Sequence, residues 1–233
     1  MKASDLLVKC LEEEGIEYIF GVPGEENADF MISLEQSKQI KFILTRHEQG
    51  AAFMAEIYGR LTGNPAVCLG TLGPGATNLI TGVADSNMDR APMLVLTGQG
   101  STDRLHKESH QIMDVVAMFR PVTKWATTIL NPDTIPEIIR KAVRLARTEK
   151  PGAVHIELPE DIAGMDSSAA AMESRHRCAW LTRFWAGPAA NKMRPQKAAA
   201  AQVIKLSCRY GGEINLAFEK AANQVGNFLA VGF

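Results

Sequence analysis

The sequence has few cysteines, no long apolar run and little net charge. Its four cysteines, Cys10, Cys68, Cys178 and Cys208, form no C-x-x-C pair and no metal-ligand spacing, which argues against a disulfide framework and a zinc ribbon. We expect reduced thiols in a cytoplasmic protein. Apolar runs such as "APMLVLTG" are too short to span a membrane, and the acidic, amphipathic N-terminus is unlike a signal peptide. A net charge of -1 gives no reason to expect a nucleic-acid partner.

Helix and strand signals alternate along the chain up to residue 164. The predicted strands are 18–22, 41–44, 66–71, 93–98 and 153–158; the predicted helices are 4–15 (capped by Ser4), 28–35, one from Glu48, 76–87 and 131–148. Short apolar strands separated by helices predict an α/β fold, a mainly parallel sheet with helices on both faces. Ligands of such sheets bind at the carboxyl ends of the strands, where Glu48 and four of the predicted turns lie.

The character of the sequence changes after Gly164. We expect one domain over 1–164, an irregular linker over 165–196, and a partial or disrupted start of a central α/β domain over 197–233. The stretch 175–209 has many basic residues, no acidic ones, and contains Trp180 and Trp185. It can be a nucleic-acid or membrane patch, a linker, or a segment whose reading frame has been disturbed. No helix or strand period organises the tryptophans, which favours the last two interpretations.

Glu48 stands at the point where an apolar strand becomes a helix. It follows His47 soon after "KFIL", and Ala51 and Ala52 after it suit a closely packed helix. Acids are common in the first turn of a helix because they complement its dipole. Taken alone, this stretch therefore favours an ordinary helix acid over a catalytic carboxylate.

Four stretches in a fixed order change that balance. They are "FGVPGEEN" (20–27), "RHEQGAAFMAEIYGR" (46–60), "LGPGATNLITGVADSNMDRAPMLVLTG" (72–98) and "HQIMDVVAMFRPVTKW" (110–125). Together they resemble the N-terminal, pyrimidine-binding domain of thiamine-diphosphate-dependent enzymes, and most of all that of acetolactate synthase (acetohydroxyacid synthase) large subunits. The resemblance covers residues 1–164. It implies the thiamine-diphosphate-binding fold and the condensation of pyruvate with a second 2-keto acid.

The resemblance also assigns roles to individual residues. Glu48 would be the catalytic acid that shares a proton with ring nitrogen N1′ of the cofactor's aminopyrimidine. The other positions that match the family are Pro23 and Gly24 as a wall near the pyrimidine, Gly73, Pro74 and Gly75 as a turn that lets backbone approach the cofactor, Asn78 in the pyrimidine pocket, and Gln111 and Lys124 at the active-site entrance on the substrate side. Leu72 stands where the family usually has a small hydroxyl residue, and His110 and Ile112 differ from the usual neighbours of the glutamine.

One family signature is missing from the sequence. Enzymes of the family that this sequence resembles hold magnesium and the diphosphate with Gly-Asp-Gly and a later Asn. Gly-Asp-Gly does not occur in this sequence, so we expect no metal site in this chain. We therefore expect a truncated or frame-disrupted gene product, or one half of a split enzyme, that is inactive alone. Its partner would be another copy or a chain that carries the diphosphate domain. Two alternatives remain: another thiamine-diphosphate decarboxylase or carboligase, and a non-catalytic dimerising or binding module. The sequence does not indicate whether FAD is used or which second keto acid reacts.

Overall fold

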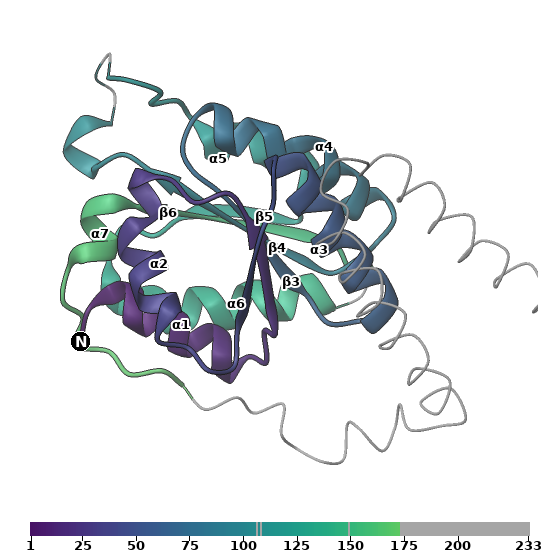
Figure 1. The fold of residues 1–233 in the computed structure, drawn as a ribbon, viewed down its shortest axis with the longest axis horizontal. Coiled ribbons are helices and arrows are strands. Elements are labelled where there is room, and N and C mark those ends of the chain that lie inside the picture. The colour runs from purple at the N-terminus through teal and green to yellow at the C-terminus, as the bar shows by residue number, and fades with distance from the viewer. Residues whose placement is uncertain (106, 108, 149, 173–233) are drawn as a thin grey trace, which may run out of the picture.

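The computed structural model describes residues 1–172 apart from 106, 108 and 149, and every statement on structure below concerns that part of the chain (Figure 1). Its strands are β1 (Tyr18–Gly21), β2 (Lys41–Leu44), β3 (Ala66–Gly70), β4 (Met93–Gln99), β5 (Trp125–Thr128) and β6 (Ala153–Pro159). They form one sheet in the order β2-β1-β3-β4-β6-β5, and every neighbouring pair is parallel. The predicted α/β class is confirmed, and the sheet is fully parallel rather than mainly so.

Helices cover both faces of this sheet, as predicted (Figure 1). They are α1 (Ala3–Glu13), α2 (Ala28–Glu35), α3 (Glu48–Thr62), α4 (Pro74–Met88), α5 (Val115–Phe119), α6 (Ile135–Arg147) and α7 (Glu160–Gly164). Helices α1, α2, α6 and α7 share one apolar core with the sheet, and α3, α4 and α5 share the other. Successive strand residues alternate between the cores, so Ile19 joins the first and Phe20 the second. Because both faces are covered, β3 and β4 are buried throughout and read as continuous apolar runs.

Three predicted helix starts differ from the structure, and that of α4 is Pro74 instead of residue 76. Ser4 does not cap α1: it lies inside the helix, buried, and its hydroxyl accepts a hydrogen bond from Ser33 Oγ of α2 at 2.8 Å. Asn131 does act as a cap, because its Oδ1 accepts from the Asp133 N–H at 3.0 Å. That cap opens the short 3₁₀ helix Pro132–Thr134, however, and α6 begins after it.

The sequence analysis missed three short elements, β5, α5 and α7. All four residues of β5 are only half-buried, and α5 and α7 have five residues each, so none produces a clear periodic signal. Four short 3₁₀ helices complete the fold: η1 (Glu25–Asn27), η2 (Thr102–Arg104), η3 (Arg120–Val122) and η4 (Pro132–Thr134).

The described part of the predicted linker lies against the domain. The Asp133 carboxylate accepts hydrogen bonds from both hydroxyls of Ser167 and Ser168 and from the backbone N–H of Ala169. These bonds lower the pKa of Asp133. The rest of the predicted linker, with its two tryptophans, and the predicted partial domain at 197–233 lie outside the described residues. Among the described helices, none is both long enough and apolar enough to cross a membrane.

Candidate active site

Apart from Lys124, the predicted site residues gather at the carboxyl edge of the sheet, around the ends of β1, β3 and β4. Asn27 joins these ends: its Nδ2 donates to the Gly70 carbonyl at 3.1 Å, and a methyl group placed on Gly98 would lie 2.5 Å from its Oδ1. The turn after β1 is thereby fixed beside the turns after β3 and β4. Pro23 is exposed in this first turn, next to Gly24.

Glu48 is the first residue of α3 and is 9% exposed. His47 caps the helix, because its Nδ1 accepts from the Gln49 N–H at 3.2 Å. Asn78 of α4 donates its Nδ2 to Glu48 Oε2 at 3.0 Å. Within the described part of the chain, no hydrogen bond reaches the other oxygen, Oε1. The helix end thus has its own cap in His47, and the Glu48 carboxylate is held by a different helix, unlike that of an ordinary exposed first-turn acid.

The glycine turn lies directly beside this carboxylate. Gly73 has φ 50° and ψ −116°, and Pro74 begins α4 after it, a position that suits proline. A methyl group placed on Gly75 would lie 3.4 Å from Glu48 Oε1 and 2.7 Å from Thr71 Cγ2. Glycine at position 75 therefore keeps open the space next to the free carboxylate oxygen.

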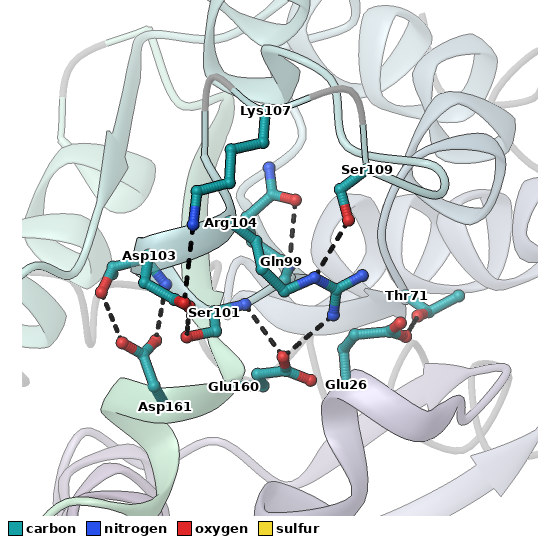
Figure 2. Close-up of polar contacts among 12 residues, drawn as sticks. Glu26, Thr71, Gln99, Ser101, Asp103, Arg104, Lys107, Ser109, Glu160 and Asp161 are labelled. Carbon is teal, nitrogen blue, oxygen red and sulfur yellow. Dashed lines mark hydrogen bonds and ion pairs between the residues drawn. The ribbon is translucent and has the colours of Figure 1, made fainter.

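Thr71 and Glu26 belong to this site, and the sequence analysis missed both. Thr71 donates its hydroxyl to Glu26 Oε2 at 2.6 Å (Figure 2), and a methyl group on Gly24 would lie 2.8 Å from the Thr71 side chain. Thr71 therefore stands between the two predicted glycine turns. Leu72, which departs from the family pattern, is instead buried at 1% exposure. The sequence offered one indication of the role of Thr71: it directly follows the predicted strand, at the edge where parallel sheets bind their ligands.

The structure separates Gln111 from Lys124. Gln111 has φ 56°, and its carbonyl oxygen would lie 2.5 Å from a methyl group on Gly73, so it belongs to the glycine turn. Lys124 precedes β5 and therefore lies at the opposite, amino edge of the sheet. Its Nζ donates to the carbonyls of Leu145 and Thr148 at the end of α6, and burial lowers its pKa. The structure therefore does not bring Lys124 and Gln111 together within this domain.

A second buried acid lies near the same edge. Glu157 of β6 accepts from Gln99 Nε2 at 3.0 Å and from the Thr128 hydroxyl at 2.7 Å. Burial raises its pKa. Because both of its carboxylate oxygens have partners within the domain, Glu157 supports the strand ends, whereas Glu48 keeps one oxygen without a hydrogen-bond partner among the described residues.

Comparison with known proteins agrees with this geometry. Residues 1–118 match the family described as thiamine pyrophosphate enzyme, N-terminal TPP binding domain. The chain belongs to this thiamine pyrophosphate enzyme family. The matched residues include both glycine turns, Glu48, Asn78 and Gln111.

The relatives of this thiamine pyrophosphate domain are named for more than one activity. A probable acetolactate synthase large subunit of Methanocaldococcus jannaschii is 43% identical over 162 residues, or 70% of this chain and 27% of the relative. A glyoxylate carboligase of Escherichia coli O157:H7 is 42% identical over 163 residues, covering 70% and 28%. An acetolactate synthase of Bacillus subtilis is 41% identical over 162 residues, covering 69% and 28%. The chain thus spans 27% to 28% of the length of these relatives.

The residues of the site fit the pyrimidine end of thiamine pyrophosphate. A ring nitrogen needs a carboxyl oxygen without another partner, and Glu48 Oε1 provides one. A flat ring also needs space beside that oxygen, which the missing side chain of Gly75 leaves, since a methyl group there would lie 3.4 Å away. Among the described residues, the acidic group Glu56, Asp85 and Asp89 has metal-like spacing, but Arg60 already forms ion pairs with Glu56 and Asp89.

Proposed function

We propose that this chain supplies the pyrimidine-side half of the active site of a thiamine pyrophosphate enzyme that joins 2-keto acids, of the acetolactate synthase type. The observation that carries the proposal is the Glu48 carboxyl, held by Asn78 on one oxygen and open beside Gly75 on the other. Two of the three relatives above are named acetolactate synthases, which supports this reaction over that of the glyoxylate carboligase.

In this proposal each residue has a distinct task. Glu48 shares a proton with the ring nitrogen of the pyrimidine, and Asn78 orients the carboxyl for that exchange. Gly73 and Gly75 let the backbone approach the ring, because neither has a side chain in the way. Pro23, Gly24 and Thr71 form the neighbouring wall. When bound, thiamine pyrophosphate supplies a thiazolium carbon that adds to keto groups once its C2 proton has been lost.

The diphosphate and magnesium would be held by another domain or chain. The sequence contains no Gly-Asp-Gly, and another copy of the same residues would lack it too, so we propose that a further domain or a separate chain carries this half of the site. We expect this chain alone to form no acetolactate from pyruvate. Phe53 and Ile57 of α3 and Ile80 of α4 are half-exposed and offer an apolar surface for such a partner. Sedimentation of the purified chain as a monomer at high concentration would count against self-association and favour a separate partner chain.

Binding of the pyrimidine alone tests the proposal with this chain as it is. We expect 4-amino-5-hydroxymethyl-2-methylpyrimidine, which lacks the thiazolium and diphosphate, to bind with weak affinity in saturation-transfer NMR. Glu48→Ala should weaken binding about 10-fold, the effect of losing a hydrogen bond to a charged group. Lys124→Met, at the opposite edge of the sheet, is the matched control and should bind as the unmodified chain does. Equal binding by the Glu48→Ala chain would support a non-catalytic module instead.

The buried cysteines agree with a cytoplasmic location, which we propose. Cys10 and Cys68 are free and buried, and burial raises the pKa of Cys10 to about 12 and that of Cys68 further still. Thiols that are kept protonated and covered suit a reducing compartment. Oxidation of either thiol in the isolated, folded chain would argue against this assignment.

A further inference from the structure

Two acids at the start of α7 reach across the sheet edge to the segment that follows β4. Strands β4 and β6 are paired up to Gln99 and Pro159, so the residues after them lie side by side. Glu160 Oε1 accepts from the Ser101 N–H at 3.0 Å, and Asp161 Oδ1 accepts from the Thr102 N–H at 3.1 Å (Figure 2). Acids in a first helical turn usually complement the helix dipole. Here both carboxylates bind the backbone of a neighbouring segment instead.

Arg104 extends the reach of Glu160 further along this segment. Its Nη1 donates to Glu160 Oε1 at 3.2 Å, and its Nε donates to Ser109 Oγ at 3.1 Å. Figure 2 shows the guanidinium between the carboxylate and the Ser109 hydroxyl. One carboxylate therefore holds Ser101 directly and Ser109 through Arg104. The Arg104 and Glu160 side chains are 36% and 33% exposed, so their ion pair is only partly shielded from water.

The segment held in this way ends on the glycine turn. Gln111 lies two residues after Ser109, and its carbonyl oxygen would meet a methyl group on Gly73 at 2.5 Å. The two backbones are packed without room for a single extra carbon. A displacement of Gln111 toward Gly73 would therefore push on the turn, and a displacement away would remove the backbone that packs against it; Gly75 of the same turn borders Glu48.

We propose that Glu160 is a positioning residue for the pyrimidine site: through Arg104 and Ser109 it holds Gln111 against Gly73, and so holds the turn beside Glu48. Asp161 provides a second anchor at Thr102, because its carboxylate also accepts a hydrogen bond from the Thr102 hydroxyl. The inference rests on the proposed function in one respect, that the Gly73 turn borders a pyrimidine site. The mechanical coupling between α7 and the turn does not depend on any cofactor.

Hydrogen–deuterium exchange of the chain without cofactor tests the coupling. The reporters are the amides of Gly75 and Thr77, which donate within the turn to the Leu72 and Gly73 carbonyls. We expect Glu160→Ala to speed their exchange about 3- to 10-fold, since a partly exposed charged hydrogen bond is lost and local opening becomes easier. Glu160→Gln keeps an acceptor oxygen and should restore much of the protection. Glu137→Ala, which removes an exposed first-turn acid of α6, is the matched control and should change nothing at the turn.

Ser109→Ala separates the relay from a general loss of stability. Among the described residues, the Ser109 side chain bonds to Arg104 alone. Its removal should therefore speed exchange at Gly75 and Thr77 while the Ser101 amide stays protected. In the double variant Glu160→Ala/Ser109→Ala, the exchange rate at Gly75 and Thr77 should be no more than about 2-fold above that of the faster single variant. The two changes are not additive because both break the same path. Faster exchange confined to 99–111 in both variants would overturn the inference and leave α7 as a local anchor. If the pyrimidine fragment does not bind while the coupling holds, the proposed function fails and the positioning role stands.

Discussion

Gly73→Ala measures how tightly the glycine turn is built. Gly73 has φ 50° and ψ −116°, a combination that suits the first central residue of a type II′ turn and requires glycine. Holding alanine in a sparsely populated backbone region costs about 1–3 kcal/mol. The new methyl group would also lie 2.5 Å from the Gln111 carbonyl oxygen. Relieving such crowding costs about 1–3 kcal/mol more, so the expected loss of unfolding free energy is about 2–6 kcal/mol.

Gly63→Ala is the matched control for this prediction. Gly63 ends α3 with φ 71°, and a methyl group there would meet no atom within 4 Å. Only the left-handed backbone then costs energy, about 1–2 kcal/mol. The midpoints of the two expected losses, about 4 and about 1.5 kcal/mol, differ by about 2.5 kcal/mol. Each kcal/mol lowers the Tm of a domain of this size by about 2–4 °C, so Gly73→Ala should melt about 5–10 °C below Gly63→Ala in circular dichroism. An equal or higher Tm for Gly73→Ala would refute the packing of Gln111 on the turn.

Three further predictions concern groups away from Glu48. Burial lowers the pKa of His155 from 6.5 to about 3, so only the unfolded chain gains its proton between these values, and unfolding free energy should fall as the pH drops through that range. Between pH 7 and pH 5, the unfolding free energy measured in urea should fall by about 2 kcal/mol more in the unmodified chain than in His155→Gln. An equal fall in both chains would contradict the assignment of this pH dependence to His155. Lys124→Met should cost about 1 kcal/mol in urea unfolding, through lost bonds to the end of α6, and leave pyrimidine binding unchanged; weaker binding would return Lys124 to the site. Cys10 and Cys68 should stay unmodified by iodoacetamide in the native chain at pH 8, as located by mass spectrometry, and modification before unfolding would contradict their burial.

The fold was predictable where apolar runs are long and bounded by turn residues. The helix 28–35 and the strand 41–44 have the predicted limits, and β3, β4 and β6 were each recognised as strands. Strand β5 was missed because its four residues are all half-buried and the sequence "WATT" forms no apolar run. Ser4 was misread because a serine that bonds a neighbouring helix and one that caps its own helix look the same in sequence.

The site was predictable as far as strand ends define it. Glu48, Asn78 and the glycine turns lie together because parallel strands end at one edge. The contact of Thr71 with Glu26 joins residues 45 positions apart, and no local pattern announces it. The spacing of Lys124 from Gln111 along the chain did not reveal that Lys124 precedes a strand, which places it at the opposite edge of the sheet. The link from Glu160 to Ser109 likewise depends on the pairing of β4 with β6, which the sequence does not state.

The most direct test of the central claim is exchange of the C2 proton of thiamine pyrophosphate with deuterated water. The sample contains this chain, a second chain that carries the diphosphate half of the site, and magnesium, and the exchange is followed by NMR. Glu48→Gln is nearly the same size but has no acidic proton to share, so we expect exchange to slow by about 10²–10⁴-fold, the usual contribution of a general acid–base group. If Glu48 served only the helix dipole, exchange would be unchanged and the variant would lose about 0.3–1 kcal/mol of stability. That second result would contradict the account.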